Sequence, residues 1–465
     1  MLRLRTIGLC SILALFWLAG CDSGPPLPDI PTRVSAPTAT NQPADTPAAT
    51  SQPAGSPQVQ PPQQTTSTPA AVITPQLSPS AVPAAARKIS KLGIHLMLDD
   101  KQSHWNVESW PQHLRYAREL VGEWGFVEVL IRLDDMDVGK WQYFLDECWR
   151  RHLTPVFRFA TFYDNEHKWW AAPIRDNEGG GYFTVAEQYR DFLDNLKWPI
   201  TPRYIIVGNE PNRGDEWENQ PNGEAYAHFL GDVSRRLREN DRNVVILNGA
   251  LDLYAPNTNG QPFVDGYRYI DADTFLNQMA GWDKDIFKKV QIWNSHSYPM
   301  GPFNQGPNVQ ALKFDYLNGA QSPRKTPWPA GLANRGINAY AWELYRVKEL
   351  GGPDLRVMIS ETGWRHAETT APAADSVHAE PSAQQVADFF QLAFLGSAGA
   401  LAQKYPPGGW TAWQSDPRVM TVIPFALDGY PKDWGHSNWL QLDPYGFVQG
   451  VYPQYQRMLD LNGGG

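Results

Sequence analysis

The chain has 465 residues and a formal net charge of −9 at pH 7. A net negative field, with no long block of lysine and arginine, argues against a protein that binds the phosphates of a nucleic acid. Of the three cysteines, only Cys148 lies beyond residue 21, so no disulfide can form within the remainder of the chain. No Cys/His cluster has the spacing of zinc ligands, and we expect neither a metal nor a cofactor.

The first 21 residues have the pattern of a secretory leader. Arg3 and Arg5 precede an apolar stretch, Ile7–Leu18, that is too short for a confident transmembrane helix. The stretch ends in Leu-Ala-Gly-Cys at positions 18–21, which resembles a bacterial lipobox. The resemblance implies a lipid on Cys21 that anchors the protein to a membrane, outside the cytoplasm in the cell envelope. The alternative is an ordinary signal peptide with a chance cysteine.

Residues 22–87 are rich in Pro, Ala, Thr, Ser and Gln and contain no Trp, Tyr or Phe. Such a segment cannot bury enough apolar surface to offset the entropy lost on ordering. We therefore predict a disordered linker that holds the remaining domain, residues 88–465, away from the membrane.

Short β-branched and apolar runs recur through this domain, and several are continuous rather than alternating. Continuous runs are typical of parallel strands buried on both faces. The strands we predict are Leu92–Met97, Val127–Arg132, Pro155–Ala160, Tyr204–Gly208, Val244–Asn248, Val290–Ser295, Arg356–Ser360 and Val419–Phe425.

Segments with apolar residues at three- and four-residue spacing lie between these runs and indicate helices. They are His113–Val121, Trp141–His152, Val185–Leu196, Glu224–Glu239, Thr274–Ala280, Asn338–Leu350 and Ala383–Leu395. Strands that alternate with helices predict an α/β fold with a parallel sheet. Eight strands favour a single closed (β/α)8 TIM barrel, and no Gly-rich phosphate loop follows the first strand to indicate a nucleotide-binding fold.

Two glutamates follow directly upon predicted strands. Glu210 stands in Asn-Glu-Pro after the fourth strand, and Glu361 stands in Ser-Glu-Thr-Gly-Trp after the seventh. A carboxylate at the end of a buried strand is costly unless it has a partner or a role. Barrel active sites lie at this end of the strands. We therefore expect both side chains in one cavity; the alternative is that both are salt-bridged residues of the rim.

These two motifs resemble those of the glycoside hydrolases of clan A, over a stretch from about residue 90 to 460. The resemblance implies a retaining glycosidase of β-linked substrates, with Glu210 as acid/base and Glu361 as nucleophile. Families 5 and 39 of that clan both fit. Two carboxyls so close push each other's pKa apart, and we expect the raised pKa on Glu210.

The resemblance also implies roles for neighbouring side chains. Asn209 would bind the sugar 2-hydroxyl, Tyr298 would orient Glu361, and His296 would contact the substrate or Glu210. We expect Arg132 to hold Glu361 ionised, the alternative being an ion pair with Asp134 or Asp135. Arg158 and His95 are weaker candidates for the site.

Aromatic side chains are candidates for stacking on sugar rings. Trp364 follows the nucleophile motif, and Trp413, Trp434 and Trp439 lie around the last strand. Clan relatives place a Trp near the end of strand eight, whereas this strand ends at Phe425. Phe425 or Trp434 would replace that Trp, and each of these Trp residues could instead belong to the core.

The sequence thus predicts a lipid-anchored hydrolase that degrades a polysaccharide or another β-glycoside, with carbohydrate as its partner. The identity of the sugar and endo or exo attack stay open, and we expect a monomer. Two other functions remain possible: a non-catalytic carbohydrate-binding barrel, and a transglycosylase of the cell surface that uses the same residues. Long loops that we expect to shape the cleft are Trp169–Phe183, Tyr254–Tyr269 and Pro299–Ala330.

Overall fold

A computed structural model of the chain describes residues 89–99, 105–177, 179–310, 329, 332–367, 380–405 and 407–462. All of these residues belong to one compact unit. The predicted leader, Cys21 and the predicted linker 22–87 lie outside the described residues and stay predictions. Within the described ranges, no helix has both the length and the apolar character that a membrane span requires.

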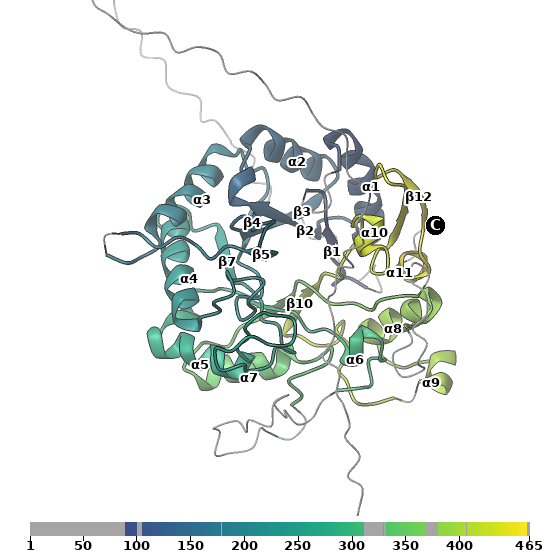
Figure 1. The fold of residues 1–465 in the computed structure, drawn as a ribbon. Coiled ribbons are helices and arrows are strands. Elements are labelled where there is room, and N and C mark those ends of the chain that lie inside the picture. Colours follow the sequence, from purple (N-terminus) through teal and green to yellow (C-terminus); the bar gives the residue numbers. More distant parts are fainter. Residues whose placement is uncertain are drawn as a thin grey trace, which may run out of the picture. The chain divides into compact units, whose positions relative to one another are not determined.

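The inner layer of the described fold is a ring of parallel strands (Figure 1). Its members are β1 (Ile94–Leu96), β2 (Gly125–Arg132), β3 (Leu153–Ala160), β6 (Arg203–Val207), β7 (Val244–Asn248), β8 (Trp293–Ser295), β9 (Val357–Ile359) and β10 (Val419–Val422). The first five pair in the order β1-β2-β3-β6-β7, and the last three form a second run. Single parallel bridges join the two runs, Leu247 with Ile292 and Leu92 with Val422. The ring therefore closes, which confirms the predicted barrel.

A long helix follows each barrel strand, and Figure 1 shows the helices around the strands. They are α1 (Trp110–Val121), α2 (Val138–Arg150), α3 (Phe183–Asn195), α4 (Gly223–Arg238), α5 (Ala272–Trp282), α7 (Tyr340–Glu349), α8 (Ala383–Leu395) and α11 (Pro453–Leu461). Seven of the eight match predicted helices, and α11 is an addition.

Several short elements decorate the barrel without belonging to the repeat. Two hairpins, β4 (Tyr163–Asp164) with β5 (Trp169–Trp170), and β11 (Leu440–Leu442) with β12 (Val448–Val451), were not predicted. The first hairpin pairs only two residues on each strand. Its runs are too short to produce a periodic pattern. The short helices are η2 (Val107–Ser109), η3 (Leu133–Asp135), η4 (Ile286–Lys288), α6 (Met300–Phe303), α9 (Ala400–Lys404) and α10 (Pro431–Trp434).

The barrel strands bury both faces, which explains their continuous apolar runs. On β6, Ile205 and Val207 belong to the large core between strands and helices. Tyr204 and Ile206 belong to a second cluster with residues of β3, β7 and β9. Side chains alternate between the two faces of a strand, so this second cluster fills the barrel interior. Each such side chain contributes about 1.5–3 kcal/mol to folding by leaving water.

Local signals set the start of α8, the helix that follows β9 and the Glu361 motif. The Ser382 side chain accepts from the backbone N–H of Gln385 at 3.2 Å, and the Gln385 side chain accepts from the Ser382 N–H at 3.0 Å. This reciprocal cap satisfies two backbone donors that a helix start leaves unpaired. Helix α8 then buries Phe390 and Phe394 against the barrel.

We predict that Gly93→Ala destabilises the protein by about 1–3 kcal/mol, because the barrel interior has no space for a methyl group there. A Cβ at Gly93 would lie 2.9 Å from Cγ1 of Ile423 and 3.0 Å from the carbonyl oxygen of Phe126. Gly281→Ala is the matched control, since Gly281 lies in α5 and a Cβ there would have nothing within 4 Å. Urea unfolding should give the control equal or higher stability, and equal losses for both variants would contradict the packing argument.

Candidate functional site

The structure brings the two predicted glutamates together at the carboxyl ends of β6 and β9. Glu210 lies three residues beyond β6, after Gly208, whose positive φ of 86° suits glycine. Glu361 lies two residues beyond β9. One carboxylate oxygen of each glutamate and a ring nitrogen of His296 all lie within 4.8 Å of one another. Both side chains are largely buried, at 13% and 11% exposure for Glu210 and Glu361.

Cationic and hydroxyl donors surround the Glu361 carboxylate. Nη1 of Arg158 donates to its Oε1, and the Tyr298 hydroxyl donates to its Oε2 at 3.0 Å. His296 Nδ1 lies 3.7 Å from Oε2. Burial alone would raise the pKa of Glu361, but the charges of His296 and Arg158 outweigh burial and lower the pKa to about 2. Glu361 is therefore an ionised carboxylate across the ordinary pH range.

Glu210 has weaker cationic support. His296 Nδ1 lies 2.8 Å from its Oε1, and Nε of Arg213 lies 3.5 Å from its Oε2. Burial raises the pKa of Glu210, and the hydrogen bond from His296 and the charge of Arg213 offset that rise only in part. The two glutamates thus have pKa values displaced in opposite directions. One can carry a proton while the other is charged.

His296 links the two carboxyl groups. Its Nδ1 faces Glu210, and its Nε2 lies 3.2 Å from the hydroxyl oxygen of Ser360. Burial lowers the pKa of His296, but the adjacent charges of Glu361 and Glu210 raise it overall. The sequence predicted His296 and Tyr298 as neighbours of the glutamates, and both lie there.

Arg158 also contacts Asn209. Its Nη1 donates to the Asn209 side-chain oxygen at 3.1 Å, so one guanidinium group orients the amide beside Glu210 and the carboxylate of Glu361. Its place in β3 explains this reach, because Arg158 pairs in register with Leu130 and Ile206 in the barrel wall.

The expected role of Arg132 in holding Glu361 requires correction. Arg132 is the last residue of β2, level with Ala160, two positions further toward the rim than Arg158. Its Nε donates to Asp134 at 3.2 Å, which matches the alternative we considered. Arg158, the weaker candidate from the sequence, contacts Glu361 instead.

The structure also separates the tryptophans. Trp364 is 2% exposed, donates its indole N–H to the Gln305 carbonyl at 2.7 Å and packs on Phe389 and Phe390. It is a core residue, so the expected contact with substrate is wrong in this structure. Trp413 and Trp439 are likewise fully buried, at 0% and 1% exposure.

Phe425 and Trp434 lie together beside the site. The Phe425 ring is half-buried, 5.1 Å from the ring of His95, and Trp434 meets it edge-on at 5.0 Å. Trp434 itself is 9% exposed. Of the two, Phe425 therefore presents more of its surface, with Trp434 packed behind it.

Arg213 is a site residue that the sequence did not reveal. Asp215 accepts two hydrogen bonds from it, at 2.9 and 2.7 Å, and Asp252 accepts one at 3.2 Å. These acids hold the guanidinium beside Glu210. Arg213 and Asp215 closely follow the Asn-Glu-Pro motif, but the contact with Asp252 depends on the fold.

The described residues do not require a metal ion to satisfy this cluster. Two carboxylates and a histidine at this spacing could hold a divalent cation. However, Arg158 and Tyr298 already donate to Glu361, and His296 already faces Glu210. Protein groups therefore already pair with the ligand atoms that a cation would use.

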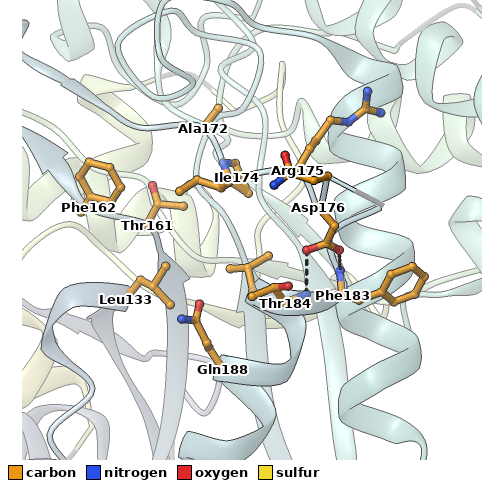
Figure 2. Close-up of a pocket in the computed structure, with 13 residues that line it drawn as sticks. Leu133, Thr161, Phe162, Ala172, Ile174, Arg175, Asp176, Phe183, Thr184 and Gln188 are labelled. Carbon is orange, nitrogen blue, oxygen red and sulfur yellow. Dashed lines mark hydrogen bonds between the residues drawn. The ribbon is translucent and has the colours of Figure 1, made fainter. Parts of the chain in front are cut away.

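A cavity of about 670 Å³ opens beside the ends of β2 and β3 (Figure 2). Its wall includes Thr161, Phe162 and Ile174, with Gln188 from α3 at its base. Asp176 accepts hydrogen bonds from the N–H groups of Phe183 and Thr184, which ties the loop to the start of α3. Part of the predicted cleft-forming segment 169–183 thus lines a cavity, although neither Glu210 nor Glu361 does.

No family model and no curated protein matches the chain. Among solved structures, a family 39 glycoside hydrolase from Bacteroides cellulosilyticus WH2 is similar at 13% identity and a TM-score of 0.45, over 81% of this chain and 64% of the other. This chain therefore spans less than two thirds of that protein. A β-glucosidase from Thermotoga maritima is similar at 14% identity and a TM-score of 0.43, over 77% of this chain and 87% of the other. A fungal β-1,4-galactanase structure is similar at 13% identity and a TM-score of 0.44, over 75% of this chain and 90% of the other.

We predict that Arg158→Met destabilises the protein by about 3–5 kcal/mol at pH 7, because it leaves Glu361 charged, buried and without its cation. The depressed pKa of Glu361 stabilises the fold above pH 4.5, the ordinary value, and this term disappears as the pH falls toward 2. The loss caused by Arg158→Met should therefore shrink as the pH is lowered.

Urea unfolding of both variants against pH measures this effect, with Arg115→Met as the control. Arg115 pairs with Glu119 at 4.0 Å, with side chains 57% and 44% exposed, and such pairs contribute little. A control as unstable as Arg158→Met, or a loss independent of pH, would contradict the assignment of Arg158 to Glu361.

Proposed function

We propose that the protein is a retaining glycosidase of β-linked substrates, with Glu361 as nucleophile and Glu210 as acid/base. The observation that supports this most directly is the approach of the two carboxyl groups, because one oxygen of each lies within 4.8 Å of the other. Retaining enzymes need their carboxyls about 5–5.5 Å apart, whereas inverting enzymes leave about 6.5–9.5 Å for a water molecule. The short separation favours direct attack by a carboxylate.

The first step in this proposal forms a covalent intermediate. An ionised Glu361 oxygen attacks the anomeric carbon as the bond from that carbon to the leaving oxygen breaks. The proton on Glu210 passes to the leaving oxygen, which departs as an alcohol or shortened sugar. The raised pKa of Glu210 and the lowered pKa of Glu361 support this division of roles.

The second step releases the sugar. Glu210, now a carboxylate, takes a proton from water, and the water oxygen attacks the anomeric carbon while the bond to Glu361 breaks. The sum of the two steps is one glycoside and one water converted to a free sugar and an alcohol. Two inversions at the same carbon leave the β configuration unchanged.

The surrounding side chains have distinct tasks in this scheme. Arg158 and Tyr298 keep Glu361 charged and oriented toward the anomeric carbon. The same two donors would stabilise the carboxylate again when its bond to the sugar breaks. His296 and Arg213 flank Glu210 and limit how far its pKa rises. Asn209, whose oxygen is held by Arg158, would turn its amide N–H groups toward a sugar hydroxyl.

Membrane attachment is a separate proposal that depends on the sequence of residues 1–87. The Leu-Ala-Gly-Cys sequence supports lipidation of Cys21, and the composition of residues 22–87 supports a flexible tether. Together they would place the barrel outside the cytoplasm, within reach of a polymeric substrate.

We predict that Glu361→Ala lowers turnover of every glycoside below detection, because no covalent intermediate can form. Glu210→Ala should lower kcat/KM by about 10²–10⁴ on alkyl glycosides and disaccharides, which need proton donation, and much less on 2,4-dinitrophenyl β-glycosides. The measurement is kcat/KM over matched gluco, galacto, xylo and manno substrates.

Added azide distinguishes the two roles. In Glu361→Ala, azide should take the place of the nucleophile and restore turnover with an α-glycosyl azide as product. In Glu210→Ala, azide should take the place of water and restore turnover with a β-glycosyl azide as product. Full activity in both variants would refute the assignment. Sugar transfer to an acceptor in place of water would favour the transglycosylase, and no turnover by the wild type would favour the binding barrel.

A further inference from the structure

A third buried glutamate lies in the barrel interior beneath the two at the mouth. Glu128 stands in the middle of β2, level with His95 of β1, and is 0% exposed. Among the described residues, neither of its carboxylate oxygens has a hydrogen-bond partner. An unpartnered carboxylate so deeply buried is costly.

Glu128 lies within reach of the guanidinium that holds Glu361. Nη1 of Arg158 is 3.5 Å from Oε1 of Glu128. The same nitrogen donates to Glu361 and to Asn209. A guanidinium NH₂ group carries only two hydrogens, and both are already engaged. Glu128 is thus the one of three acceptors around Nη1 that receives no hydrogen bond.

The protonation state of Glu128 decides whether it competes with Glu361 for a hydrogen bond from Arg158. Burial raises its pKa to about 8, although the charge of Arg158 lowers it in part. The other titratable groups that face it are His95, Glu361 and His296. Burial and the charge of Arg158 lower the pKa of His95 to about 3, so His95 is neutral and places no positive charge beside a Glu128 anion. At neutral pH, Glu128 is therefore mostly an uncharged acid.

We propose that Glu128 is a positioning residue that acts through Arg158: protonated, it leaves the guanidinium to Glu361, and ionised, it draws a hydrogen bond of Nη1 away from Glu361. This inference rests on the proposed function. It adds a third carboxyl group, beyond the two of the mechanism, whose protonation state affects how Glu361 is oriented. Loss of the Glu128 proton thereby misaligns the nucleophile and slows attack.

The test is the pH profile of kcat/KM on 2,4-dinitrophenyl β-glycosides of glucose, galactose, xylose and mannose, whose leaving group needs no proton from Glu210. The wild type should lose activity above pH 8, by about fivefold between pH 8 and 9 for a single ionisation with a pKa of about 8. Glu128→Gln, which keeps the shape and cannot ionise, should hold its activity over that range. Glu128→Met, an apolar replacement of similar length, is a second variant expected to give the same profile.

Glu343→Gln is the matched control. Glu343 is also 0% exposed with a pKa raised by burial, to about 7, but it binds Ser295 and the Trp293 indole N–H on the helix side of β8. Its replacement should leave the fall above pH 8 in place. A fall that persists in both Glu128 variants, or that also disappears in Glu343→Gln, would overturn the proposal.

A second measurement does not need a substrate. Because the folded-state pKa of Glu128 is raised, its stabilising effect is complete below pH 4.5, its ordinary value, and is lost as the pH rises through 8. The Tm of Glu128→Gln minus that of the wild type should therefore increase from pH 5 to 8 and then level off. A constant difference would overturn the proposal. Absence of glycoside turnover beside a rising difference would instead count against the proposed function.

Discussion

The ion pair between Arg158 and Glu361 is the interaction on which the rest of the site depends. A carboxylate 11% exposed at the end of a buried strand would take up a proton unless a cation lay against it. Arg158 supplies that cation from inside the barrel, on β3, the strand that pairs with β6. Without it, the pKa of Glu361 would rise and would differ less from the raised pKa of Glu210.

The closed barrel provides the rigidity that this pairing needs. Arg158 lies within β3, and Glu210, His296 and Glu361 follow β6, β8 and β9, so their relative positions depend on the register of parallel strands. The Tyr298 hydroxyl then contacts the Glu361 carboxylate, and Nδ1 of His296 contacts the Glu210 carboxylate. Because these ionisable groups lie so close together, the protonation state of each one depends on the charges of the others.

Much of the fold was predictable because the strands and helices have clear apolar periods, and both glutamates follow strands directly. Arg132 and Arg158 both stand in apolar strands, and only the strand register shows which one reaches Glu361. Trp364 lies beside a site motif yet faces the core, because packing against α8 was not readable from spacing. Glu128 did leave a signal, because it is the one acidic residue in the strand Gly125–Arg132, but its neighbours depend on three-dimensional proximity.

The separation of the two carboxyls carries a stereochemical consequence that proton NMR can read directly. A β-glycoside that the wild type hydrolyses is followed from mixing, before the sugar equilibrates by mutarotation. We expect the β-anomer of the released sugar to form first. First appearance of the α-anomer would mean single displacement by water and would contradict the proposed role of Glu361 as nucleophile.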